Sequence, residues 1–291
     1  MTLEGRAEAK INLGLRILER RPDGYHSIRS VFHTVSLHDS VAVTCTPGSR
    51  RITIDVSGLD IPGEPSENLA CRAAEEFLAE SGLKRDVYIS IEKRIPVAAG
   101  LGGGSSDAAC VLRLLRRATG VDPGLEKVAL RVGSDVPFLL GGGAALVEGR
   151  GELIRRMASG DFWAVILNPG IRVSTAEAYE AWDRRYCGLT TRPAGCDDRC
   201  PELAWHEGRP FPVSLCNDFL PLLLERHPAA MELLGQLENS CPAWGLSGSG
   251  PSFFGLFRSA SEAEAFGLSV PRSLSPAVCR ATGGVGASSN W

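Results

Sequence analysis

The chain has 291 residues, of which 44% are hydrophobic and 22% are charged, and its formal net charge is -3. This length allows one large domain or two modest ones, and the balance is that of an ordinary globular protein rather than a disordered one. The small negative charge gives no indication of a nucleic-acid or membrane-surface protein.

The N-terminal residues lack the apolar core of a secretory signal, and no run of about 18 apolar residues predicts a membrane span. Nine cysteines are an odd count and lie in apolar surroundings, which indicates reduced thiols in a cytoplasmic protein. The cluster Cys187, Cys196, Cys200 and His206 lacks a C-x-x-C pair, so its spacing does not favour a zinc site. We expect no bound metal, no nucleic-acid or membrane partner, and a monomer or weak homodimer.

The first predicted elements are strands. Apolar residues alternate over 11–17, which predicts a strand with one buried face and places Lys10 and Asn12 together on the other face. Further strands are predicted at 31–35, 41–45 and 52–56. Ser66 is predicted to cap a helix that stops at Gly82, and a strand over 87–91 then leads into a glycine-rich loop.

The pattern after this loop predicts a helix over 108–118, closed by Gly120. The remaining predicted elements are a helix from Asp122–Pro123 to about Gly133, strands at 144–148 and 162–167, a helix from the capping box at 174–177 to about Tyr186, a long loop over 187–212, helices within 216–239, a strand at 252–257, a short helix and a final strand. Because strands come in clusters rather than in strict alternation with helices, we expect an α+β fold. A composition shift near 155–160 predicts two domains, 1–157 and 158–291.

The most informative stretch is PVAAGLGGGSS, residues 96–106, between a predicted strand and a predicted helix. Glycine gives up the most backbone entropy on folding, so this cluster indicates that the backbone approaches something closely. A strand, a glycine-rich turn and a helix N-terminus form an anion site from backbone N–H groups, to which Ser105 and Ser106 add hydroxyl groups. Asp107 is expected in the first helical turn, pointing outward.

Two other phosphate-binding motifs are excluded. A Walker A loop needs a Gly-Lys pair, which the chain lacks, and Ser105 stands where a Rossmann fingerprint starting at Gly100 needs glycine. A purely structural turn remains the alternative to an anion site.

With these motifs the chain resembles the GHMP-type small-molecule kinases, and among them those that act on a cytidine-diphospho alditol. The motifs follow the family's order: AKINL at 9–13, RPDGYH at 21–26, ENL at 67–69, IEKRIPVAAGLGGGSS at 91–106, GSDVPF at 133–138, EGRGE at 148–152, ND at 217–218 and LSGSG at 246–250. The resemblance implies an N-terminal domain like the second domain of ribosomal protein S5 and a ferredoxin-like C-terminal domain, with the active site in the cleft between them. It also implies transfer of the ATP γ-phosphoryl group to the 2-hydroxyl of the alditol, in the non-mevalonate isoprenoid pathway.

The resemblance further implies roles for single residues. Asp135 is the expected general base, with Lys10 as its electrostatic partner. ATP is expected against Asn68, Lys93, Pro96, Val97, Ala98, Ala99, Gly100, Leu101, Gly102, Gly103, Gly104, Ser105 and Ser106. The cytidine substrate is expected against Asn12, Tyr25, His26, Phe32, Thr175, Tyr179, Gly248 and Ser249, with Tyr25 and His26 at the base. No carboxylate indicates a dedicated Mg²⁺ site, so Mg²⁺ is expected to come with ATP, held largely by phosphates and water.

Each of these roles has a plainer alternative. Asp135 could be an N-cap or turn residue, Lys10 a solvated strand residue, Tyr25 a turn anchor and Phe32 a core residue. Asn68 and Lys93 could both be surface residues. Alanines at 98 and 99 stand where glycine is common in the family, which stiffens the entry to the loop and leaves the ATP contact of those residues open.

Three alternatives apply to the whole chain. A GHMP kinase of different substrate, such as a sugar, homoserine or mevalonate, is disfavoured by the Tyr25–His26 pair and the extra glycine. A non-catalytic nucleotide-binding module is disfavoured by the presence of Lys10 and Asp135. A related decarboxylase should show a different serine-rich loop.

Overall fold

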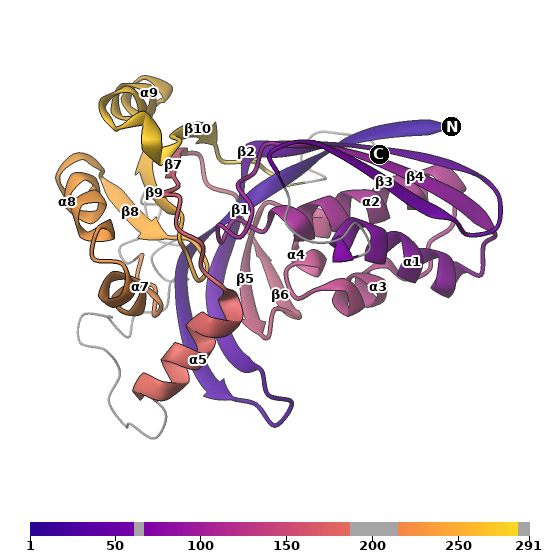
Figure 1. Cartoon of the computed structure of the whole chain (residues 1–291), viewed down its shortest axis with the longest axis horizontal. Helices are drawn as coiled ribbons and strands as arrows, with labels where there is room; N and C mark the ends of the chain where they lie inside the picture. Colours follow the sequence, from indigo (N-terminus) through magenta and orange to yellow (C-terminus); the bar gives the residue numbers. More distant parts are fainter. Residues whose placement is uncertain (61–66, 187–214, 285–291) are drawn as a thin grey trace.

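The computed structural model describes residues 1–60, 67–186 and 215–284 (Figure 1). The described strands are β1 (Thr2–Arg20), β2 (His26–Pro47), β3 (Ile52–Gly58), β4 (Arg85–Lys93), β5 (Ala144–Gly149), β6 (Leu153–Met157), β7 (Trp163–Leu167), β8 (Ala243–Leu246), β9 (Phe253–Phe257) and β10 (Ala277–Arg280). The described helices are α1 (Leu69–Ser81), α2 (Gly103–Thr119), α3 (Leu125–Val132), α4 (Val136–Gly141), α5 (Thr175–Tyr186), α7 (Leu220–Arg226), α8 (Ala230–Ser240) and α9 (Ala260–Ser269). The predicted α+β class is confirmed.

The first sheet is organised around β2. It has the order β3-β4-β2-β5-β6, and β1 pairs antiparallel with β2. The first half of β2 pairs with β5 over residues 28–33, and the second half pairs with β4 over residues 40–47. The two strands predicted at 31–35 and 41–45 are therefore one strand. Asp39, which is typical of a turn, is fully buried in it because its carboxylate accepts hydrogen bonds from the backbone N–H groups of Arg94 and Ile95.

Several predicted helix boundaries move in the structure. Helix α1 is capped by Asn68, whose Oδ1 accepts from the N–H of Ala70 at 2.9 Å, while the predicted cap Ser66 lies outside the described residues. Helix α3 begins at Leu125 rather than at Pro123, because the Asp122 carboxylate first accepts from the N–H groups of Gly124 and Leu125. The short elements α4 and β6 were not predicted, and the predicted helical stretch 216–239 is two helices.

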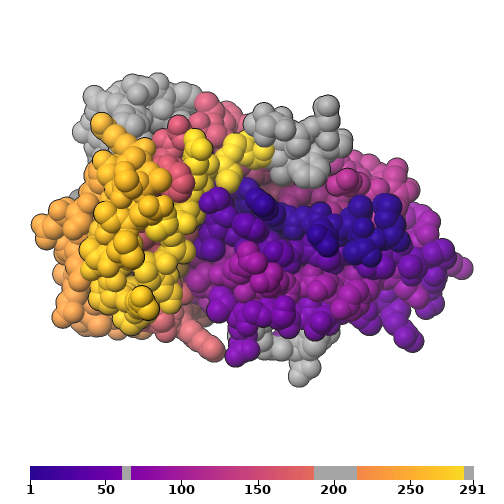
Figure 2. Space-filling view, turned by 90° about the horizontal axis from the view of Figure 1, so that it is seen from above, coloured from indigo at the N-terminus to yellow at the C-terminus, as the bar shows by residue number. Residues whose placement is uncertain are grey.

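The second sheet is antiparallel, with the order β10-β7-β9-β8. In Figure 1 it lies at the opposite end of the molecule from α1 and α3. A buried apolar cluster joins the two sheets: Ile11 and Val35 from the first sheet and Ile166 and Phe254 from the second are each 1% exposed or less. Figure 2 shows the C-terminal residues, in yellow, packed against the N-terminal half, in indigo and purple. The predicted loop at 187–212, with its Cys187–His206 cluster, lies outside the described residues.

None of the helices in the described ranges is long and apolar enough to cross a membrane. The predicted division into residues 1–157 and 158–291 stays a prediction, although the first sheet ends with β6 and the second begins with β7.

Two glycine-containing loops, one from each half of the chain, touch each other. Gly100 has a φ of +74°, and a Cβ there would lie 2.0 Å from the backbone oxygen of Ser247. The Ser247 hydroxyl donates to the Gly100 carbonyl at 2.8 Å, and Asn217 holds the same loop by donating to the carbonyls of Leu246 and Gly248. The glycine cluster predicted that this backbone approaches something closely. At Gly100 that close contact is with another loop of the protein itself.

Replacing Gly100 with alanine is expected to destabilise the fold much more than Gly82→Ala. Gly82 has a nearly equal φ of +70°, but a Cβ added there would meet nothing within 4 Å, so its change should cost only the left-handed strain of about 1–2 kcal/mol. Gly100→Ala should add about 1–3 kcal/mol for the forced backbone shift. Urea unfolding of both variants measures the difference, and equal losses would contradict the close approach.

Candidate active site

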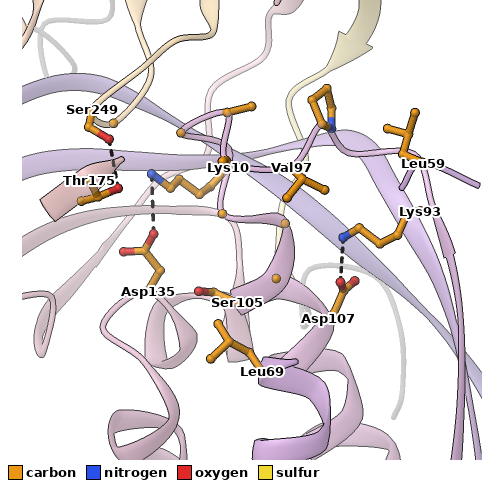
Figure 3. Close-up of a pocket in the computed structure, with 18 of the residues that line it drawn as sticks. Lys10, Leu59, Leu69, Lys93, Val97, Ser105, Asp107, Asp135, Thr175 and Ser249 are labelled. Carbon is orange, nitrogen blue, oxygen red and sulfur yellow. Dashed lines mark hydrogen bonds and ion pairs between the residues drawn. The ribbon is translucent and has the colours of Figure 1, made fainter. Parts of the chain in front are cut away.

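A single pocket of ≈ 810 Å³ collects side chains from both halves of the chain (Figure 3). The predicted site residues that line it are Lys10, Asn12, Phe32, Asn68, Lys93, Pro96, Val97, Ala98, Ala99, Gly100, Gly102, Gly103, Gly104, Ser105, Asp135, Thr175, Tyr179, Gly248 and Ser249. Leu101 and Ser106 are buried and do not line the pocket, and Tyr25 and His26 also lie outside this lining.

Lys10 and Asp135 face each other inside the pocket. Lys10 is 4% exposed, and its Nζ lies 3.6 Å from Oδ2 of Asp135 and donates to Oδ1 of Asn12 at 2.7 Å. The same ammonium lies 4.8 Å from the ring centroid of Phe32. Burial lowers the pKa of Lys10, while the Asp135 carboxylate opposes that shift.

The Asp135 side chain lines the pocket and does not cap the helix that follows it. It occupies the N-cap position of α4, as the plainer interpretation predicts, yet forms no side-chain cap hydrogen bond there. The carboxylate is 30% exposed and points to Lys10 (Figure 3). A carboxylate beside an ammonium can accept a proton from a hydroxyl group while the ammonium offsets negative charge that develops nearby.

The glycine loop places the N-terminus of α2 at the pocket. Its N-cap, Gly102, has a φ of +69° and forms no side-chain cap bond, so the first-turn N–H groups can bind an anion. Ser105 lines the pocket, whereas the Ser106 hydroxyl donates to the carbonyl of Glu8 at 2.7 Å and so serves the fold. Ala98 has a φ of +52°, a conformation in which glycine is less strained.

Lys93 and Asp107 form a buried cluster with Asp39 at the base of the loop. The expectation that Asp107 points outward is wrong: it is 1% exposed, and its Oδ2 accepts from Nζ of Lys93 at 2.7 Å. The Lys93 ammonium also donates to Asp39. Both ion-pair partners of Lys93 are therefore carboxylates of the protein, even though Lys93 lines the predicted ATP pocket.

Of the residues predicted for the cytosine base, His26 contacts Tyr179 of the pocket, whereas Tyr25 is an exposed residue beside Arg150. The ring of His26 stacks on Tyr179, with centroids 4.9 Å apart and an angle of 11° between planes. Burial, with the Asp135 charge adding to it, raises the pKa of the Tyr179 hydroxyl. Tyr25 is 53% exposed, and the Arg150 guanidinium lies 5.2 Å from its ring centroid.

Sequence reasoning missed two side chains that position this region. Asp183, one turn after Tyr179 on α5, forms a 2.7 Å hydrogen bond with Nε2 of His26. Ser30 accepts from the amide of Asn12 at 2.9 Å and thereby orients it. Tyr179 and Asp183 lie on one face of α5, but nothing in the sequence pairs that face with His26. Thr175 and Ser249, predicted separately, form a 3.1 Å hydrogen bond with each other.

The chain is similar to known proteins over most of its length. Residues 68–143 match the family model of the GHMP kinases N terminal domain. The chain is 40% identical over 274 residues to a 4-diphosphocytidyl-2-C-methyl-D-erythritol kinase of Geobacter metallireducens, covering 92% of this chain and 94% of the relative. It is 43% identical over 274 residues to one of Anaeromyxobacter sp. (strain Fw109-5), covering 90% and 85%.

A solved structure agrees with the sequence relatives. The crystal structure of a 4-(cytidine 5'-diphospho)-2C-methyl-D-erythritol kinase matches with a TM-score of 0.81 and 33% identity, over 97% of this chain and 100% of the other. The GHMP kinase fold expected from the motifs is thereby confirmed. The chain belongs to the 4-diphosphocytidyl-2-C-methyl-D-erythritol kinase family of GHMP kinases and is a small-molecule kinase.

Proposed function

We propose that this chain transfers the γ-phosphoryl group of ATP to the 2-hydroxyl of 4-diphosphocytidyl-2-C-methyl-D-erythritol, giving the 2-phosphate and ADP in the non-mevalonate isoprenoid pathway. The observation that carries this proposal is the position of the Lys10–Asp135 pair. It lies in one pocket between a glycine loop that can bind phosphates and the side chains of Thr175 and Tyr179.

The proposed mechanism assigns proton removal to Asp135. Its carboxylate accepts the proton of the attacking hydroxyl as the new O–P bond forms. Lys10 pairs with that carboxylate and stabilises negative charge on the transferring group, and Asn12 and Phe32 hold its ammonium in place. Phosphoryl transfer needs mainly alignment and charge stabilisation, which buried and mutually bonded side chains provide.

The triphosphate of ATP is assigned to the first-turn N–H groups of α2 and to residues 96–106. Among the described residues, no group of three or more His, Cys, Asp or Glu side chains could hold a metal ion. Mg²⁺ is therefore assigned to the incoming nucleotide, as its complex with the phosphates and water. In this proposal residues 1–157 form the ATP-binding domain and residues 158–291 the substrate domain.

The cytidine end of the substrate is assigned to the aromatic side of the pocket. Tyr179 lines the pocket and stacks on His26, and Tyr25 precedes His26 in the chain. The loop with Gly248 and Ser249 is assigned to the substrate diphosphate because its backbone lies beside Lys10: a Cβ on Gly248 would stand 3.5 Å from Nζ of Lys10.

A coupled ADP-release assay across several acceptors tests the substrate assignment. The cytidine-diphospho alditol, mevalonate, homoserine and a sugar are offered in parallel with ATP. Turnover with the cytidine-diphospho alditol alone is the expected result, and preferential turnover of any other acceptor would replace the proposed substrate.

Asp135→Asn should reduce kcat by about 10²–10⁴-fold, the usual contribution of a positioned general base, while nucleotide binding and the fold persist. Asp161→Asn is the matched control, because that side chain is 81% exposed, pairs with Arg280 and lies outside the pocket. The kcat of both variants and their nucleotide Kd are measured. Undiminished turnover by Asp135→Asn would remove the base assignment.

Tyr25→Ala should raise the KM for the cytidine substrate about two- to tenfold, from the loss of ~0.5–1.5 kcal/mol of stacking, with little change in the KM for ATP. Tyr88→Ala is the control, since Tyr88 is 45% exposed on β4 and does not line the pocket. Steady-state kinetics with each substrate varied in turn gives both constants. Equal increases for the two substrates would argue against a role at the base.

A further inference from the structure

The two carboxyl groups around Lys93 have unequal hydrogen bonding. Oδ1 of Asp39 accepts from the backbone N–H groups of Arg94 and Ile95 at 2.6 and 2.8 Å, and its Oδ2 accepts from Lys93. Oδ2 of Asp107 accepts from the same ammonium, but its Oδ1 is buried and has no hydrogen-bond partner among the described residues. Three N–H donors therefore face the Asp39 carboxyl group, and only one faces Asp107.

The charges of this cluster do not balance while both acids are ionised. Two carboxylates and one ammonium, each 3% exposed or less, carry a net charge of -1. Burying an uncompensated charge is costly, so such a site tends to take up a proton. Burial raises the pKa of Asp107 from 3.8 to about 7, with Lys93 opposing the rise and Asp39 adding to it by its charge and a side-chain hydrogen bond.

The other groups around Asp107 do not supply the missing charge. On α2 the Cys110 thiol is neutral, because burial raises its pKa to about 11. From β1, Glu8 accepts from the Thr282 hydroxyl, and in the loop Arg94 pairs with Glu92. Asn68 and Leu69, at the start of α1, line the pocket with Asp107 and are uncharged. The other ammonium of this lining, Lys10, pairs with Asp135, and Asp60 and Glu67 add only negative charge.

The cluster lies directly behind the start of α2. A Cβ on Gly103, the first residue of that helix, would stand 3.3 Å from Nζ of Lys93. An extra negative charge at this depth would oppose the positive field of the helix N-terminus, which the proposed function assigns to the triphosphate.

We propose that Asp107 holds a proton in the folded protein, so that the Asp39–Lys93–Asp107 cluster is electrically neutral behind the phosphate-binding loop, and that losing this proton weakens nucleotide binding. The first half of this proposal concerns the chain alone, and the second half rests on the proposed function. Asp107 is in this view a positioning residue that acts on the nucleotide through the cluster.

The sign of the stability effect follows from linkage. The folded state binds the Asp107 proton more tightly than the unfolded state, so the stabilisation is complete below pH 3.8 and is lost as the pH rises through about 7. Asp107→Asn keeps the shape of the neutral acid and supplies an N–H donor in place of its O–H, but it cannot ionise. Its melting temperature minus that of the wild type should therefore increase from pH 5.5 to 8.5.

Two further variants and an infrared spectrum identify which carboxyl group holds the proton. Asp55→Asn, at an exposed position of β3, should give a difference that does not change with pH. Asp39→Asn should be destabilised at every pH, because it removes the negative charge and places an NH2 group against at least one of the three N–H donors. Infrared spectra of the wild type at pH 6 should contain a protonated-carboxyl C=O band that Asp107→Asn lacks and that disappears with a midpoint near 7.

Nucleotide binding tests the second half. Calorimetric titration with ADP from pH 6 to 8.5 should give a ratio of wild-type to Asp107→Asn Kd that rises above pH 7, by at most about tenfold per pH unit for one proton. Titration of the nucleotide itself cancels in that ratio.

Each contrary result overturns a defined part of the proposal. If Asp107→Asn is equally destabilised at all pH values and the infrared spectrum loses no carboxyl band, Asp107 is ionised. If Asp39→Asn keeps the wild-type melting temperature instead, the proton belongs to Asp39. If Asp107→Asn does not fold, the wild-type infrared titration alone decides. A flat Kd ratio would overturn the nucleotide link, and absence of ADP binding to the wild type would overturn that link together with the proposed function, leaving the protonation result intact.

Discussion

Burial of the Lys10 ammonium is the constraint on which the site depends. An ammonium that is 4% exposed is unfavourable unless charged and polar groups surround it, and here Asn12, Asp135 and the face of Phe32 do so. These partners come from β1, the N-terminus of α4 and β2. The first sheet and α4 must therefore both be in place before the carboxylate and the ammonium can meet in the pocket.

The sequence contained the parts of the site that depend on local periodicity. Alternation along β1 was sufficient to place Lys10 and Asn12 on one face, and the structure joins them at 2.7 Å. The strand–loop–helix pattern around residues 96–106 was likewise local, as was the clustering of strands that indicated an α+β fold. The roles assigned to Asp135, Tyr25 and Tyr179 came from the resemblance and remain proposals.

The rest depends on contacts between distant segments, which no spacing reveals. The sequence predicted that Asp107 points outward, because no local pattern reveals the buried cluster that holds it. That cluster includes Asp39, which lies 54 residues before Lys93 in the chain. His26 and Asp183 are 157 residues apart, so no local pattern could indicate their hydrogen bond. Helix α1 is capped by Asn68, because its amide oxygen accepts from the N–H of Ala70. Serine and asparagine are both favoured N-caps, so propensity alone does not identify which one caps the helix.

The contact of Gly100 with Ser247 couples the 96–106 loop directly to the 247–250 loop. Any displacement of the 96–106 backbone must move the 247–250 backbone, since they share a hydrogen bond and leave no space for even a methyl group between them. Occupancy of one loop would then alter the affinity of the other by a coupling free energy that is equal in both directions. In such an enzyme, the contact between the two loops would determine the order in which the two substrates bind.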